Sequence, residues 1–138
     1  YFRLYLTVFL YVSAMLIGLT LKEVNMSKPS IAHVMNEFMA FGELLDDAYW
    51  EASSIEHKDF IYDIISLFSQ EVAELNKLSI QDHHYPYEFI TEGIRRAISK
   101  VTSLEHELGN IVQRTHTLTD MKEVLSNVLA ILEGQAEY

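Results

Sequence analysis

Carboxylates and imidazoles are the side chains of this sequence best suited to metal chemistry, since it has 20 Asp and Glu residues, six His and no Cys. A di-iron bundle requires Glu-x-x-His pairs, because positions i and i+3 share one helix face. Neither this pattern nor the His-x-x-x-His spacing of zinc proteases occurs. A transition metal could bind adventitiously at Asp82, His83 and His84. The other candidate groups, Glu56–His57 and Glu105–Glu107, consist of sequence neighbours, so their side chains point in different directions. We therefore predict no cofactor and no resident metal.

Covalent catalysis has no recognisable motif in this chain. There is no Gly-x-Ser-x-Gly turn, no phosphate-binding glycine loop and no cysteine, and the five glycines are scattered. The formal net charge of −10 would repel the phosphates of nucleic acids and anionic lipid headgroups. We therefore expect no nucleic-acid binding, and we expect basic proteins as the electrostatic partners.

Two short segments carry a resemblance to a known enzyme family. They are Gln70–Leu75, with the sequence Gln-Glu-Val-Ala-Glu-Leu, and Glu107–Asn110, with the sequence Glu-Leu-Gly-Asn. They resemble the glutamate-rich first motif and the Glu-x-x-Asp second motif of MazG-type nucleotide pyrophosphohydrolases, an all-α family that holds Mg²⁺ against a triphosphate. The resemblance implies that the metal ligands would be Glu71, Glu74 and Glu107.

These segments also depart from the family pattern. Asn110 stands where the family has an aspartate, and Gln70 stands where it has a glutamate. A hard dication would therefore lose charged ligands on which it normally depends. The interpretation we prefer places the three glutamates on the solvated outer faces of helices.

Apolar residues at helical spacing predict that the chain is all-α, with a four-helix bundle or coiled-coil-like module after its N-terminal segment. The first helix of this module is expected to be capped by Ser27 or Ser30. The second is expected to begin at a capping box formed by Ser53 and Glu56. Because the two are so close in sequence, they form either an antiparallel hairpin or one kinked helix.

A third helix is predicted to start near Tyr87, after a polar stretch at residues 79–87. Its apolar residues alternate spacings of 4 and 3 over three heptads, as in the contact surface of a coiled coil or bundle. We call these residues the packing seam; they are Ile90, Ile94, Ala97, Val101, Leu104, Leu108 and Ile111. A threonine-rich stretch then predicts a break, followed by a fourth helix from a cap at Asp120 to a terminating Gly134.

The run from Leu4 to Leu21 is uncharged over eighteen residues and is flanked by Arg3 and Lys22. As a helix it would be about 27 Å long, close to the roughly 30 Å hydrocarbon core of a bilayer. We therefore predict a hydrophobic membrane-anchor helix and linker at residues 1–25, and an acidic helical-bundle module at residues 26–138, on either side of the membrane. The alternatives are a central helix of a soluble bundle and a poorly matched signal peptide.

Two aromatic pairs are candidates for contact with a partner. Tyr49 and Trp50 lie near the end of the first predicted helix, and Tyr85 and Tyr87 lie in the polar loop. Amphipathic aromatic side chains are enriched at binding hot spots, although packing within the bundle is the simpler alternative. If the two pairs act together, we expect them to form a partner-contact patch near one end of the bundle.

These features predict a non-enzymatic, membrane-anchored interaction or assembly subunit that binds a protein partner or a second copy of itself. One alternative is a sensory module, because a membrane helix followed by a four-helix bundle is similar in layout to the extracytoplasmic part of bacterial chemoreceptors and sensor kinases. The other alternative is a degenerate pyrophosphohydrolase of the MazG type.

Overall fold

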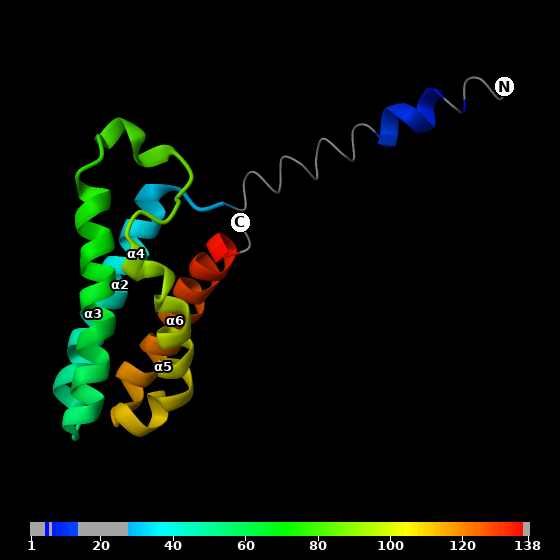
Figure 1. Ribbon diagram of the computed structural model, residues 1–138. Helices are drawn as coiled ribbons and strands as arrows, with labels where there is room; N and C mark the ends of the chain where they lie inside the picture. Colours follow the sequence, from blue (N-terminus) through cyan, green and yellow to red (C-terminus); the bar gives the residue numbers. More distant parts are fainter. Residues whose placement is uncertain (1–4, 6, 14–27, 137–138) are drawn as a thin grey trace.

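The computed structural model describes residue 5, residues 7–13 and residues 28–136 of the chain. The described elements are helical, and the prediction of an all-α fold is confirmed (Figure 1). They are α2 (Ile31–Glu51), α3 (Ile55–Asn76), the 3₁₀ helix η1 (Ile80–His84), α4 (Glu92–Arg95), α5 (Ala97–Ile111) and α6 (Thr115–Ala136). Tyr5 and residues 7–13 are also helical.

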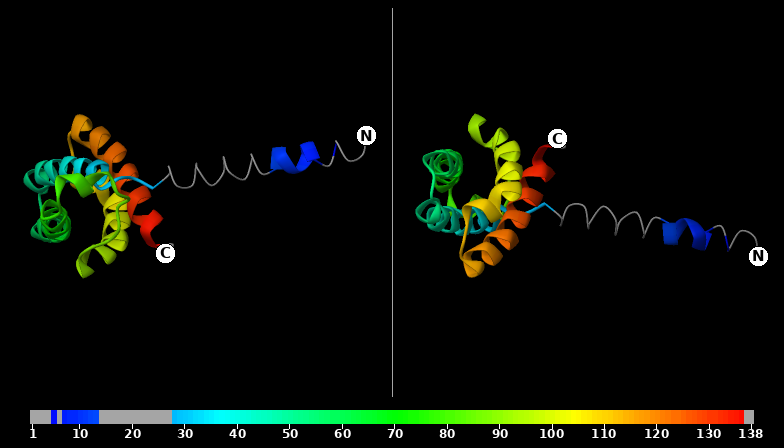
Figure 2. Two further views of the ribbon diagram at one scale, coloured as in Figure 1. Left: turned by 90° about the horizontal axis from the view of Figure 1, so that it is seen from above. Right: turned by 90° about the horizontal axis from the view of Figure 1, so that it is seen from below.

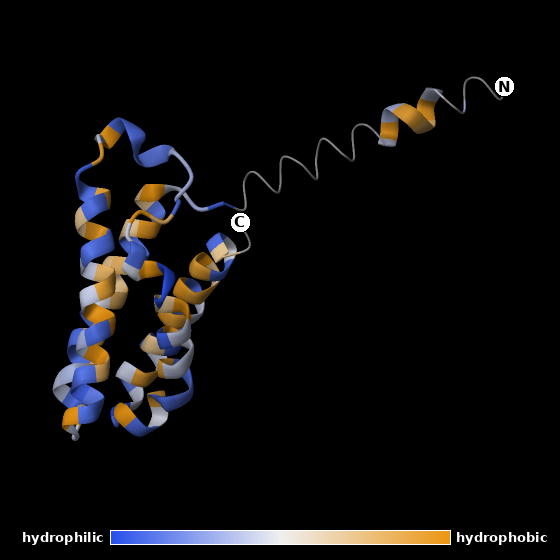
Figure 3. Ribbon diagram, in the orientation of Figure 1, coloured by the Kyte–Doolittle hydropathy of each residue, from blue (hydrophilic) through white to orange (hydrophobic). Residues whose placement is uncertain are grey.

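The four long helices form an up-down-up-down bundle around one apolar core (Figures 1 and 2). Helix α2 packs against α3 and α6, and α5 packs against the same two helices. Figure 3 shows apolar and polar residues alternating along each helix, as expected for helices that bury one face. One end of the bundle therefore holds the start of α2, η1, α4 and the end of α6, and the other end holds the α2–α3 and α5–α6 junctions.

The junction between α2 and α3 resolves one alternative left open by the sequence. Ala52 has φ −63° and ψ 131°, which ends α2 in an extended conformation, and the chain reverses to form an antiparallel hairpin. Ser30 caps α2, as expected, by accepting a hydrogen bond from the His33 amide. The predicted cap at Ser53 is wrong by one residue, because the Ser54 hydroxyl accepts from the His57 amide and starts α3 at Ile55.

The third predicted helix is shorter than expected and is interrupted. Residues 87–91 are not helical, and Arg96 separates α4 from α5. The side chains of the packing seam from Ile94 to Ile111 lie in the core, but Ile90 is 44% exposed and its assignment to the seam is wrong. The physical reason is that the amides of Ile90 and Thr91 donate to the Glu71 carboxylate, so this part of the backbone is held outside a helix.

The fourth predicted helix is longer than expected at both ends. Helix α6 begins at Thr115 rather than after Asp120, because the Thr119 hydroxyl donates to the Thr115 carbonyl within the helix and does not break it. At the other end, the helix continues through Gly134 to Ala136, so the predicted stop at Gly134 is wrong. Val112–Arg114 forms the actual break between α5 and α6.

The predicted N-terminal membrane helix falls largely outside the described residues, since residue 4, residue 6 and residues 14–21 are not among them. In the part of the chain that the structure describes, no helix is both long enough and apolar enough to cross a bilayer. The large apolar side chains of Tyr5 and of residues 8–12 are exposed. A transmembrane helix is therefore not supported by the described part of the chain.

Candidate functional site

Glu71 on α3 is the buried charged residue of the described chain, with an exposed fraction of 0%. Its Oε1 accepts hydrogen bonds from the Tyr87 hydroxyl and the Ile90 amide, each at 2.8 Å. Its Oε2 accepts from the Thr91 amide at 2.8 Å and from the Thr91 hydroxyl at 2.7 Å. Four donors therefore satisfy a carboxylate that would otherwise be costly to bury.

The donors all come from one segment, residues 85–91, which also joins the start of α2. The Ile31 amide donates to the Tyr85 carbonyl, and the Tyr87 amide donates to the Pro29 carbonyl, both at 2.9 Å. Thr91 in turn caps α4, because its hydroxyl accepts from the Ile94 amide. Glu71 thus links α3 to a segment that positions the beginnings of both α2 and α4.

Tyr87 contributes to the core as well as to this polar contact. Its ring is fully buried and packs edge-on against Phe38, with the ring centres 5.7 Å apart. Burial raises the pKa of the Tyr87 phenol well above its usual range, and the charge of Glu71 and the hydrogen bond to it raise this pKa further. The phenol is therefore held as a hydrogen-bond donor to Glu71.

Because of Tyr87, the free energy of unfolding is expected to decrease at alkaline pH. The phenol of the unfolded chain ionises near pH 10, whereas the folded state keeps the proton. The stabilisation due to Tyr87 is therefore complete below about pH 10 and is lost as the pH rises further. Tyr87→Phe should reduce this alkaline loss and cost about 1 kcal/mol at neutral pH, because Glu71 loses one donor.

Urea unfolding at neutral pH and at about pH 11 measures both effects. Tyr62→Phe provides the matched control, because Tyr62 is exposed on α3. The control should keep the pH dependence of the unaltered chain. An alkaline profile of Tyr87→Phe identical to that of Tyr62→Phe would contradict the role given to Tyr87.

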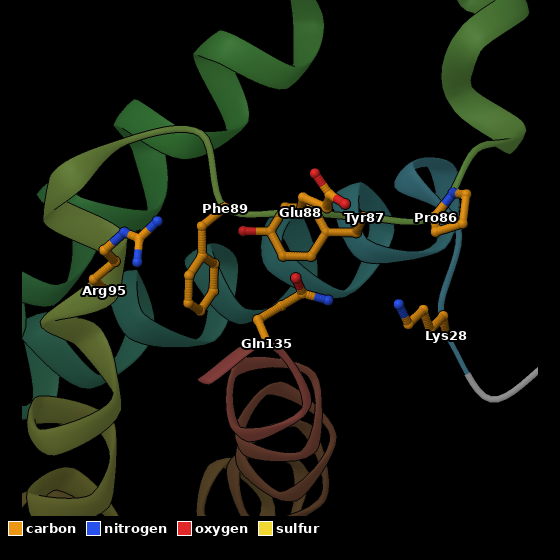
Figure 4. A pocket seen from close by; sticks show the side chains of 7 residues that line it. All are labelled: Lys28, Pro86, Tyr87, Glu88, Phe89, Arg95 and Gln135. Atoms are coloured by element: carbon orange, nitrogen blue, oxygen red, sulfur yellow. The ribbon is translucent and has the colours of Figure 1, made fainter. Parts of the chain in front are cut away.

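A pocket of about 300 Å³ lies beside this network, at the same end of the bundle (Figure 4). We call it the Arg95 pocket. Its walls come from the segment before α2, the segment 85–91, α4 and the last turns of α6, and its lining residues are Lys28, Pro86, Tyr87, Glu88, Phe89, Arg95 and Gln135. No pattern in the sequence links Lys28, Arg95 and Gln135, because only the fold brings these distant positions together.

An aromatic cluster lies at the opposite end of the bundle. The rings of Tyr49 and Trp50 meet edge to face, with centres 5.4 Å apart. Lys58 Nζ donates to the Tyr49 carbonyl at 2.6 Å and lies 4.6 Å from the centre of the Tyr49 ring and 5.6 Å from that of Trp50. Trp50 is nonetheless 74% exposed. We call Tyr49, Trp50 and Lys58 the aromatic–lysine cluster.

The four aromatic residues singled out from the sequence do not form one patch. Tyr49 and Trp50 lie at the end of α2, while Tyr85 lies beside its beginning, about 30 Å away along a 21-residue helix. Tyr85 is exposed, but Tyr87 is fully buried and its assignment as a contact residue is wrong. The reason is that Tyr87 fills the core under segment 85–91 and donates to Glu71.

The three glutamates implied by the MazG resemblance have different surroundings. The interpretation of Glu71 as a solvated outer-face residue is wrong, since its carboxylate is buried and accepts four hydrogen bonds. Glu74 forms an ion pair with Lys77 at 2.7 Å, and Glu107 accepts a hydrogen bond from the side-chain Nδ2 of Asn110 at 3.3 Å. Across residues 5, 7–13 and 28–136, no group of three or more His, Asp or Glu side chains could hold a metal ion.

A signal for the burial of Glu71 was present in the sequence. Residues 61, 64, 68, 71 and 75 follow the 3, 4, 3, 4 spacing of a core stripe, and four of these residues are apolar. A charged residue at the remaining position predicts a buried, paired carboxylate rather than a solvated one.

Comparisons with protein-family models, with curated proteins and with solved structures found no match to this chain, so its function is inferred from its own residues.

Proposed function

We propose that this chain is a non-enzymatic helical-bundle module that binds a protein partner through the aromatic–lysine cluster. The observation that carries the proposal is the exposure of Trp50 in a fixed setting. A tryptophan held by neighbouring side chains loses little conformational entropy when a partner covers it, so more of its burial energy is available for binding. Lys58 provides this constraint by contacting the Tyr49 carbonyl and both rings.

The charges around the cluster indicate the chemistry of the partner. Asp46, Asp47, Glu56 and Asp59 are exposed and lie within two helical turns of Trp50 or Lys58 in sequence. A partner with an apolar pocket for the indole ring and a basic rim would match this surface. Opposite charges at the rim would mainly increase the association rate and make it sensitive to salt.

We further propose that residues 4–21 attach this module to a membrane, in keeping with their uncharged, apolar sequence. This attachment would restrict the module to a membrane surface and raise its effective concentration near a membrane-bound partner. The partner-binding proposal does not depend on it, because the aromatic–lysine cluster belongs to the bundle.

The test is recovery of the partner with the tagged full chain from its source cells, quantified by mass spectrometry. The unaltered chain should retain one protein in stoichiometric amount at low salt and less of it at high salt. Trp50→Ala should reduce this amount by about tenfold or more, as expected for a hot-spot residue. Ile80→Ala is the matched control, because Ile80 is an apolar residue that is 85% exposed at the opposite end of the bundle.

The control should recover as much partner as the unaltered chain. Equal recovery with Trp50→Ala would contradict the assignment of the site. The absence of any stoichiometric partner from the unaltered chain would contradict the function itself.

A further inference from the structure

We propose that the Arg95 pocket binds a small organic carboxylate, with the carboxylate on the Arg95 guanidinium and the apolar body against the Phe89 ring. A volume of about 300 Å³ is at the lower end of ligand pockets and is suited to a small organic acid. This inference does not depend on the proposed partner, which would bind at the opposite end of the bundle.

Arg95 is the group that would recognise the carboxylate. Its guanidinium lies 5.9 Å from the centre of the Phe89 ring and forms no ion pair with any carboxylate among the described residues. Figure 4 shows Arg95 extending toward Phe89 at one end of the pocket. A planar guanidinium presents parallel N–H donors that match the two oxygens of a carboxylate, and contact with an aromatic ring keeps it oriented.

The other lining residues favour an anion with an apolar body. Lys28 and Arg95 are cationic, and Glu88 is the carboxylate among the lining residues. In Figure 4 the Glu88 side chain points away from Gln135. The Tyr87 hydroxyl donates to Glu71, so Tyr87 has no free hydroxyl donor to offer a ligand in the pocket. The Gln135 amide, from α6, can donate to the ligand between the two cations.

The location of the pocket gives binding a structural consequence. Its lining joins Lys28, which precedes α2, to Gln135 in the last turns of α6 and to Arg95 in α4. A ligand in contact with these residues would hold the segment leading into the bundle against its end. Ligand binding should therefore raise the thermal midpoint of the full chain, because the ligand binds the folded state.

Benzoate is a suitable probe, since it combines a carboxylate with a flat apolar ring, and benzamide is its neutral counterpart. We expect benzoate to shift the amide NMR signals of Phe89, Arg95 and Gln135 in the full chain in a saturable manner, with a Kd in the millimolar range. Arg95→Gln should weaken benzoate binding by about tenfold, because the bidentate contact is lost. Benzamide should bind about tenfold more weakly than benzoate, since it lacks the charge.

Arg96→Gln is the matched control. It removes the same charge from the adjacent residue, which is exposed and does not line the pocket. Benzoate affinity should stay within about twofold of that of the unaltered chain, because distant surface charges are screened by salt. Equal weakening of benzoate binding by Arg95→Gln and Arg96→Gln would indicate a general charge effect and no specific site. Equal affinity for benzoate and benzamide, or no saturable shift of the three NMR signals, would also overturn the proposal.

Discussion

Replacing Glu71 with glutamine is expected to lower the free energy of unfolding by about 3 kcal/mol, the largest effect among the polar residues of the bundle. The glutamine side chain has the same shape, but its NH2 group would face the backbone amide of Ile90 or that of Thr91, depending on its orientation, and each of these amides is itself a donor. The Thr91 hydroxyl can rotate to accept, whereas the backbone amide cannot. The loss therefore combines weaker hydrogen bonds with an unsatisfied buried donor.

Urea unfolding measures this loss, and Glu74→Gln is the matched control on the same helix. Glu74 pairs with Lys77 at the surface, with exposed side-chain fractions of 40% and 69%. Its replacement should cost less than about 0.5 kcal/mol, because exposed ion pairs contribute little. Similar losses for the two substitutions would show that the Glu71 network does not hold segment 85–91 in place.

The second large effect is expected at Leu104 in the packing seam. Leu104 is fully buried, so Leu104→Glu would place a charge without a partner in the core, where α5 packs against α3 and α6. Such a change costs several kcal/mol, and we expect it to unfold the bundle at room temperature. Circular dichroism and the spread of amide NMR signals would report the loss of fixed structure.

Ser103→Glu tests whether the position, and not the added charge, causes this loss. Ser103 is the preceding residue on the exposed face of α5, where its hydroxyl donates to the Ser99 carbonyl. The substitution adds the same charge and should change the free energy of unfolding by less than about 0.5 kcal/mol. If Ser103→Glu and Leu104→Glu were equally destabilising, the seam would not be the main packing surface of α5.

The two residues also illustrate how far the sequence could be interpreted. Leu104 belongs to a regular repeat, and the repeat placed it on the buried face from Ile94 to Ile111 without knowledge of any other helix. Glu71 belongs to an equally regular stripe, but a charged residue on a stripe gives no indication of where its partners are. Its donors lie 16 to 20 residues further along the chain.

Local patterns therefore determined the all-α fold, the number of long helices in the bundle and the buried face of most of α5, because helical periodicity and capping depend on neighbouring residues. Only the tertiary structure decided that residues 87–91 are not helical and that Tyr87 is buried. It also decided that the two aromatic pairs lie at opposite ends of the bundle and that Lys28, Arg95 and Gln135 line one pocket. These features depend on contacts between segments far apart in sequence. Burying a carboxylate without hydrogen-bond donors costs a large amount of free energy. The backbone amides of Ile90 and Thr91 supply donors to Glu71, and this requirement overrides the local preference for helix at these residues.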